Sequence, residues 1–519
     1  MSTPADAPAD ERPMPPLSVR LGFFAMVVGM FMAILDVQIV ASSLGEIQAG
    51  LSASVEEISW VQTSYLIAEV IMIPLSGTLA RVMSTRVLYT VATLGFTVMS
   101  LFCALANSIE TMILARSLQG FFGGAMIPSV FATAYTIFPR RMMTKVSVTI
   151  GLTATMGPTI GPTLGGYITE TLSWHWLFTL NVIPGVIVAA TVWNFIRVDK
   201  AEPSYLRGLD LIGLVLLTVS LGSLQYMLEE GPKNDWFEDR LIVQLGLLSA
   251  IAGALFFVRA FTYRQPIIDI RAFGDRNFAL GCTYSFIVGV GLYGSVYLTP
   301  LFLSQVRDYN AMQIGVIMMV TGLFQIGMAP VAGMLSARID LRLMLGFGFL
   351  LFCFALYLNA HLTAQSSYWE LFLPQALRGV SLMFCFIPVN RLALGTLTPD
   401  KLKNGSSLYN LMRNLGGAIG LASLNTILQE RTALHLSRLS DHITLSRPEV
   451  QAYIDRLSER LGDSITGDPE LAALRQLFAL VQREAIVMSF NDCLLVVGFT
   501  FAVSLILMPL VRKPRGMSG

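Results

Sequence analysis

Long stretches without a charged side chain recur along this sequence. Residues 21–35, 87–107, 146–169 and 343–360 contain none, although the chain as a whole is 13% charged. Soluble proteins average about 25% charged residues. A helix needs about 20 apolar residues to cross the hydrocarbon core of a bilayer, and the longest of these stretches reach that length. We therefore expect an all-α integral membrane protein rather than a water-soluble one.

Hydropathy and charge placement predict fourteen transmembrane helices, with both termini on the same side. The predicted spans are 21–44, 58–80, 87–106, 109–138, 146–169, 177–196, 209–228, 241–261, 278–306, 311–335, 343–360, 369–394, 406–428 and 485–511.

Lys and Arg concentrate in alternate short connections between these spans. Arg140, Arg141 and Lys145 are typical of the basic set. The opposite short connections hold little beyond Lys233, Arg240 and Arg307. Basic loops stay in the cytoplasm, so both termini are predicted to be cytoplasmic. The net charge of +1 argues against a nucleic-acid partner.

The ends and one connection stand apart from the spans. Residues 1–19 are expected to be a disordered cytoplasmic tail, and residues 512–519 a second cytoplasmic tail. In the long connection 429–484, Val450, Ile454 and Leu457 recur at helical spacing, and Asp468 precedes a second helix. We expect an external helical cap there. The alternative is a solvated spacer with transient helices.

Two segments of the first half recur in the second half. Pro74 to Gly77 matches Pro330 to Gly333, and Arg116 to Gly120 matches Gln375 to Gly379 with Arg and Gln exchanged. The number of residues that separates matching positions is nearly the same for both matches. They predict six-helix bundles at 20–200 and 266–511, with two inserted helices at 201–265. Repeats of this kind are typical of secondary transporters, whose substrate site lies between the halves.

Several motifs identify a family. Leu35 and Asp36 begin Leu-Asp-Val-Gln-Ile-Val, and Trp174 begins Trp-His-Trp-Leu-Phe. The fifth span carries a Gly-Pro motif, made of Gly157, Pro158, Gly161, Pro162, Gly165 and Gly166. Together with Arg116, these segments resemble the major facilitator superfamily, specifically its fourteen-span drug:proton antiporter family of the EmrB type. The resemblance implies the major facilitator fold and makes the Gly-Pro segment an antiporter motif.

Charged residues inside the spans are the candidates for proton coupling. Asp36 would cost about 2.5–3.5 kcal/mol unpaired, so we expect it to bind a proton, attract a cationic substrate or do both. A purely structural acid is the alternative. Glu69 either carries a proton, meets a basic substrate group or pairs with an arginine. Arg116 is the expected counter-charge, with Gln119 on the same helix face. In the family, this arginine is assigned to proton transfer.

The glycines of the antiporter motif recur every four residues. Small residues at this spacing allow close helix contact. We expect either a seal between the halves that limits proton leak or ordinary tight packing, and the two interpretations are compatible.

A substrate cavity between the halves is predicted to use aromatic, methionine and polar side chains, since these accept varied compounds. Packing in the core or against lipid is the alternative for each. The candidates are Tyr65, Tyr284, Tyr293, Tyr297, Gln325, Met328, Arg378, Met383, Asn390 and Arg413.

These observations favour a proton-coupled antiporter that exports amphipathic organic compounds across the bacterial inner membrane by alternating access, giving multidrug efflux and antibiotic resistance. A dedicated exporter of one endogenous metabolite, such as a siderophore or a fatty acid, is the alternative. The sequence has no P-loop and no metal or nucleophile constellation, so we expect neither an ATP-driven pump nor an enzyme, and no cofactor. The resemblance implies a periplasmic adaptor protein and an outer-membrane channel of the TolC type as partners, with 429–484 as the docking surface.

Overall fold

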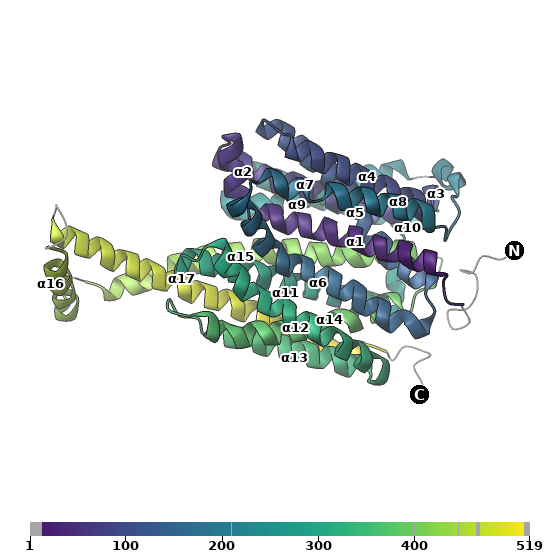
Figure 1. Ribbon diagram of the computed structural model, residues 1–519. Coiled ribbons are helices and arrows are strands. Elements are labelled where there is room, and N and C mark those ends of the chain that lie inside the picture. The colour runs from purple at the N-terminus through teal and green to yellow at the C-terminus, as the bar shows by residue number, and fades with distance from the viewer. Residues whose placement is uncertain (1–12, 209, 399–400, 445, 463–467, 513–519) are drawn as a thin grey trace.

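The fold is all-helical and was analysed in a computed structural model that describes residues 13–208, 210–398, 401–444, 446–462 and 468–512. The long helices run side by side along one axis (Figure 1). Twelve of the described helices are long and apolar enough to cross a membrane. The helices α6 and α15 run alongside these twelve but contain more Gly, Thr and charged residues. All fourteen predicted spans are therefore helical in the described part of the chain.

The first bundle is built from the N-terminal helices. Its long members are α1 (Leu17–Ala41), α3 (Val55–Met83), α4 (Thr85–Ala104), α5 (Ile109–Ile137), α6 (Arg140–Thr171) and α8 (Val182–Phe195). The short helices α2 (Leu44–Leu51) and α7 (His175–Thr179) precede α3 and α8. Because α1 begins at Leu17, residues 17–19 are helical rather than part of the expected tail. Residues 1–12 of that tail lie outside the described residues.

The second bundle is built from the C-terminal helices. They are α11 (Arg276–Arg307), α12 (Ala311–Arg338), α13 (Leu341–Asn359), α14 (Tyr368–Leu394), α15 (Leu402–His442) and α17 (Pro469–Ser504). Of the expected C-terminal tail, 512 is described and 513–519 lie outside the described residues.

Helix caps repeat between the bundles as the sequence motifs do. Ser54 and Glu57 form a capping box at the start of α3, with each side chain accepting a hydrogen bond from the other's backbone N–H. Asn310 and Gln313 form the same box at the start of α12. These pairs are related by the same offset as Gly77 and Gly333. Capping satisfies backbone donors at a helix start, so both halves begin this helix in the same way.

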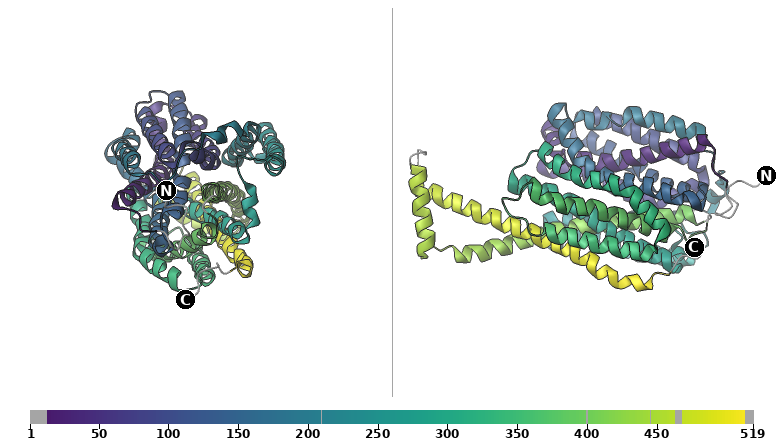
Figure 2. Two further views of the ribbon diagram at one scale, coloured as in Figure 1. Left: turned by 90° about the vertical axis from the view of Figure 1, so that its right-hand side faces the viewer. Right: turned by 60° about the horizontal axis from the view of Figure 1, so that its bottom comes forward.

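The two inserted helices pack as a pair on one side of the bundles. They are α9 (Leu211–Glu230) and α10 (Arg240–Thr262), and the view along the helix axis places them at the edge of the molecule (Figure 2). Ser220 and Ser249 exchange hydrogen bonds of 3.0 and 2.9 Å between them. Trp236 in the connection donates a 2.7 Å hydrogen bond to Thr426 of α15. The pair therefore contacts the second bundle as well as the first.

The described residues of the connection 429–484 (429–444, 446–462 and 468–484) form a helical projection beyond one end of the bundle (Figure 1). The helices α15 and α17 continue into it without a break at the span ends predicted near 428 and 485, and α16 (Pro448–Gly462) lies between them at the tip. Ile454 of α16 and Ala473 of α17 are both buried. At the base, His435 Nε2 lies 2.9 Å from Asp492 Oδ2. The helices expected in this segment are present. The first and last described residues, 13 and 512, lie at the opposite end of the bundle, which we call the terminal end.

Candidate functional site

Asp36 lies at the centre of a buried hydrogen-bond network in the first bundle. Its carboxylate accepts hydrogen bonds from Arg116 Nη1 at 2.5 Å, Asn181 Nδ2 at 2.7 Å and Gln119 Nε2 at 3.2 Å. Asp36 is 2% exposed, and Arg116 and Gln119 are fully buried. The structure thus brings three of the four predicted proton-coupling residues, Asp36, Arg116 and Gln119, into direct contact.

Arg116 has further contacts that orient its guanidinium. Its Nε donates to the Val61 carbonyl at 3.2 Å and its Nη1 to Gln119 Oε1 at 2.7 Å. The guanidinium also lies 4.2 Å from the centre of the Tyr65 ring. Within the described residues, Arg116 Nη2 has no hydrogen-bond partner. The arginine is therefore held over Tyr65 and keeps one donor free for another acceptor.

Asn181 belongs to this network although it was not among the predicted coupling residues. It lies at the break between α7 and α8, where a polar side chain can turn inward, and it also donates to Ser100 Oγ at 3.1 Å. The sequence signal for it was its place three residues after the Trp-His-Trp-Leu-Phe motif, within the segment that carries the family resemblance.

A buried ion pair of this kind has two stable chemical states. Removing one partner from a buried pair destabilises a protein by about 3–5 kcal/mol, because the other charge is left uncompensated. Protonation of Asp36 neutralises the carboxylate and removes its attraction for Arg116. Proton binding by Asp36 and close contact with Arg116 therefore oppose each other.

Glu69 lies apart from this network, on a cavity between the two bundles. About 90 Å³ of the cavity is accessible to water-sized molecules. Glu69 is 4% exposed and has no cationic nitrogen within 4.0 Å among the described residues, although Arg116 and Arg413 act on it electrostatically. The alternative in which Glu69 is directly paired with an arginine is not observed. The cavity is lined by Ile34, Val37, Gln38, Gln62, Leu66, Glu69, Val70, Ile127, Gln225, Glu229, Tyr293, Asn414, Gly417, Ala418 and Leu421.

Of the ten residues expected to line a substrate cavity, Tyr293 lines this one. Three other tyrosines have different surroundings. Tyr65 packs beneath Arg116, Tyr284 packs against Phe349, and Tyr297 donates a 2.7 Å hydrogen bond to Asn425.

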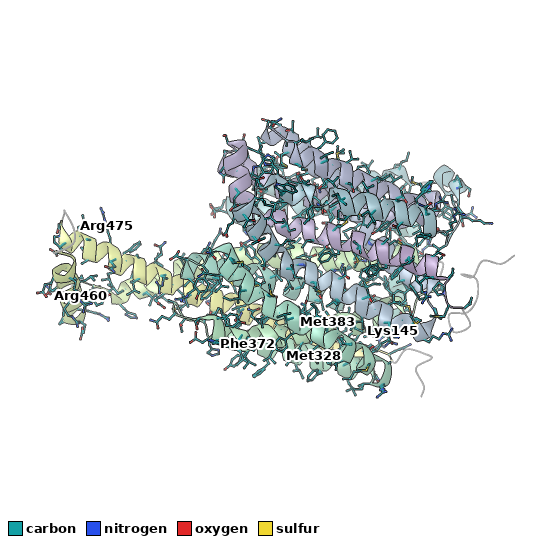
Figure 3. All side chains as sticks on the ribbon, in the orientation of Figure 1. Lys145, Met328, Phe372, Met383, Arg460 and Arg475 are labelled. Carbon is teal, nitrogen blue, oxygen red and sulfur yellow. The ribbon has the colours of Figure 1, made fainter. Side chains whose placement is uncertain are left out.

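The remaining candidates pack inside or between the bundles. Met328 and Met383 belong to one apolar cluster of α6, α12, α13 and α14, where they lie close together in Figure 3. Gln325 is fully buried. The Asn390 carbonyl accepts a 3.2 Å hydrogen bond from Tyr135 of α5. These residues do not line the cavity, because the helix faces that carry them are closed by neighbouring helices.

Two arginines of the second bundle are also buried. Arg378 donates to the Ser295 carbonyl at 2.9 Å, to Thr321 Oγ1 at 3.1 Å and to Thr299 Oγ1 at 3.2 Å. No carboxylate lies within 4.0 Å of it in the described part of the chain. Arg413 donates to Asn410 Oδ1 at 2.6 Å and lies over the Phe131 and Phe386 rings. Both side chains are oriented by neutral groups and not by acids.

The glycines of the predicted antiporter motif pack against α1. A Cβ atom on Gly157 would lie 2.6 Å from Ile34 Cγ2, and one on Gly165 would lie 2.8 Å from the Ile39 carbonyl oxygen. A Cβ atom on Gly161 would likewise lie too close to Gln38. Pro158 and Pro162 lie inside α6, as Gly166 does. The motif therefore sets the approach of α6 to the segment of α1 that carries Asp36.

At the terminal end, polar contacts join the two bundles. Lys403 of α15 forms an ion pair with Asp199, which follows α8, and also donates to the Ala80 carbonyl at 3.1 Å. Ser76 Oγ lies 3.1 Å from Ser407 Oγ. The cavity lies nearer the other end, since its α1 residues reach Gln38, close to the end of that helix at Ala41. These contacts hold the two bundles together at the terminal end.

Known proteins share both the sequence and the fold. Residues 26–421 match the family model of the Major Facilitator Superfamily. The chain is 41% identical over 472 residues to the colistin resistance protein EmrB of Acinetobacter baumannii, covering 91% of this chain and 92% of that one. It is 28% identical over 514 residues to the multidrug export protein EmrB of Escherichia coli K12, covering 98% of each.

Among solved structures, the human organic anion transporter MFSD10 (TETRAN) has a similar fold. The TM-score is 0.55 at 13% sequence identity, and the match covers 94% of this chain and all of that one.

Proposed function

This chain belongs to the Major Facilitator Superfamily, as a homologue of the EmrB multidrug export proteins, and on this premise we propose how its residues couple proton entry to efflux. It is a multi-pass membrane transporter of the bacterial EmrB family and not an enzyme. The proposal is that it exports amphipathic organic compounds from the cavity between the bundles, and that Asp36 carries the proton.

The buried Asp36–Arg116 ion pair is the observation that carries this proposal. With Asp36 ionised, Arg116, Gln119 and Asn181 satisfy its carboxylate and hold α1, α5 and the start of α8 together. Protonation weakens this contact and frees the guanidinium to move. A two-state contact at the junction of three helices can bias the bundle toward one of two arrangements, as alternating access requires.

Two helices connect the coupling site to the cavity. Tyr65, beneath Arg116, and Glu69, on the cavity, lie one turn apart on α3. Gln38 on the cavity lies two residues after Asp36 on α1. A shift of Arg116 is therefore transmitted to the cavity wall by direct contact. Substrate in the cavity acts on the ion pair through the same residues.

The proton gradient supplies enough energy for this exchange. One elementary charge crossing 100 mV is worth about 2.3 kcal/mol, and about 1.4 kcal/mol changes an equilibrium tenfold. A more than tenfold substrate gradient can therefore be maintained without hydrolysis of a nucleotide.

Substrate flux in proteoliposomes under an imposed pH gradient tests the proposal. We expect flux that follows the gradient in the unmodified protein and is lost in Asp36→Asn, which keeps the shape of the side chain but cannot carry a charge. Glu110→Gln is the matched control, since Glu110 is an exposed carboxylate in the first turn of α5, the helix that carries Arg116. Flux that ignores the gradient, or that persists unchanged in Asp36→Asn, would falsify the assignment.

We further propose that the terminal end faces the cytoplasm of an inner membrane, and that the projection docks a periplasmic adaptor connected to an outer-membrane channel of the TolC type. The basic loops at the terminal end support this orientation. The projection supports the docking, since α15 and α17 continue as helices well beyond the bundle. Arg460 of α16 and Arg475 of α17 lie near its tip (Figure 3).

Shortening the projection tests the docking proposal. The cut is made beyond the His435–Asp492 contact, so that the base of the two helices stays joined. We expect unchanged flux in proteoliposomes and loss of drug resistance in cells. The milder double change Arg460→Glu and Arg475→Glu should lower resistance without shortening the helices. Loss of flux in both variants would mean that the projection is structural.

A further inference from the structure

The inserted helix α9 forms part of the cavity wall. Gln225 and Glu229 of α9 line the cavity together with residues of α1, α3 and α15. Thr63 Oγ1 of α3 lies 3.5 Å from Glu230 Oε1, which fixes the end of α9 against α3. The inserted pair is therefore more than a spacer between the bundles, because one of its side chains brings a carboxylate into the space between them.

The charged side chains that line the cavity are acidic. Among the described residues that line it, Glu69 and Glu229 are the charged ones, and none is Lys or Arg. Neither carboxylate forms an ion pair within 4.0 Å with a described residue, whereas neighbouring Glu230 is paired with Lys233 at 3.0 Å. Glu69 is buried and Glu229 is partly buried, and a carboxylate withdrawn from water without a cation is costly unless a ligand supplies the cation.

The axial offset between the two acidic residues follows from helix geometry. The Thr63–Glu230 contact places the end of α9 level with Thr63 of α3. Glu69 lies six residues further along α3, so at a rise of 1.5 Å per residue it is about 9 Å deeper. Glu229 thus lies near the mouth of the cavity and Glu69 near its inner end.

We propose that Glu229 and Glu69 form a two-carboxylate site that selects amphipathic substrates carrying two cationic groups offset by about 9 Å along the helix axes. This inference rests on the proposed function and names its substrate class. The rest of the wall fits such a compound, since apolar side chains such as Leu66 and Leu421 alternate with the amides Gln62 and Asn414. Apolar surface holds the body of the compound while the carboxylates select its charges.

The test compares aromatic bisquaternary ammonium compounds with a monoquaternary analogue of matched hydrophobicity. Flux is measured in proteoliposomes under one imposed pH gradient, with spacers shorter than, close to and longer than the carboxylate spacing. We expect the lowest half-saturation concentration for the matching spacer. In Glu229→Gln, the preference for the dication over the monocation should fall about tenfold, the effect of losing one close charge contact.

Two further variants keep the test decisive. Glu230→Gln is the matched control, because Glu230 is adjacent in sequence but is held by Lys233 and Thr63 outside the lining. Gln225→Glu adds a carboxylate one turn earlier on the cavity face of α9, and it should raise the preference for dications. This gain cannot come from misfolding.

The outcomes separate this inference from the proposed function. Gradient-driven flux with the same dication preference in the unmodified protein, Glu229→Gln and Gln225→Glu overturns the two-carboxylate site and leaves the proton-coupling proposal intact. Flux of every compound that is independent of the gradient overturns the coupling proposal instead. A dication preference that depends on Glu229 but not on the gradient supports the site alone.

Discussion

At the residue scale, the two halves hold a buried guanidinium in different ways. Arg116 meets the carboxylate of Asp36, whereas Arg378 meets the carbonyl oxygen of Ser295. Positions 36 and 295 are related by the same offset as Gly120 and Gly379. The second bundle thus keeps the cation but has a serine where the first has an acid. Among the described residues, the fully buried ion pair that a proton can open lies in the first half.

This difference predicts unequal effects of removing each arginine. Arg116→Leu should destabilise the protein by about 3–5 kcal/mol, because it leaves the Asp36 charge buried and unpaired. Arg378→Leu should have a much smaller effect. It removes a buried cation, and the Ser295 carbonyl still accepts a 3.0 Å hydrogen bond from Thr299. Thermal unfolding of both variants in detergent measures the difference.

A double change provides the control for this prediction. Adding Asp36→Asn to Arg116→Leu removes the orphaned charge, so part of the lost stability should return. Equal destabilisation by the two single arginine changes would contradict the assignment of the acid-base pair to the first bundle alone.

At the scale of elements, the contact between α1 and α6 depends on atoms that glycine lacks. Gly161→Ala and Gly165→Ala place a methyl group against Gln38 and the Ile39 carbonyl. Overpacking of this kind costs about 1–3 kcal/mol, and here it also displaces the helix that carries Asp36. We expect a lower unfolding temperature and a faster proton leak into vesicles that contain no substrate.

Gly327→Ala is the matched control for the glycine contact. Gly327 lies within α12, and a Cβ atom there would meet nothing within 4 Å. Its replacement should be neutral or stabilise the helix by about 0.5–1 kcal/mol. If Gly161→Ala behaves like Gly327→Ala in both assays, then α6 does not seal the proton pathway.

The elements were predictable from the sequence to different degrees. Charge-free runs predict the spans well, because a bilayer excludes unpaired charges. They do not predict the ends of α15 and α17, since a helix does not stop where the membrane does. Asp36 and Arg116 were predictable as partners because a bilayer also excludes an unpaired charge within a span. The cavity residues were not, because a helix that is apolar all round gives no periodicity to show which face is open.

At the scale of the whole molecule, the closed terminal end depends on contacts between the two halves. Asp199 accepts hydrogen bonds from the Thr85 N–H at 3.0 Å and hydroxyl at 2.7 Å, and it pairs with Lys403 across the seam. The side chains of Lys403 and Asp199 are 18% and 15% exposed, so solvent screens them less than a surface pair. Opening this end for substrate entry must break that pair.

Breaking the pair should therefore open the terminal end. In a Ser407→Cys background, Lys403→Ala should raise the rate at which a charged maleimide labels the cysteine about fivefold. This corresponds to a loss of about 1 kcal/mol in the stability of the closed state. Asp199→Asn should have the same effect, and the double variant should add little to either, because both changes remove one contact. Lys233→Ala, which breaks the ion pair with Glu230 just beyond the end of α9, is the control and should leave the rate unchanged. Equal rates in the Lys403 and Lys233 variants would show that this ion pair does not hold the seam closed, and the closed state would then rest on other contacts such as Ser76–Ser407.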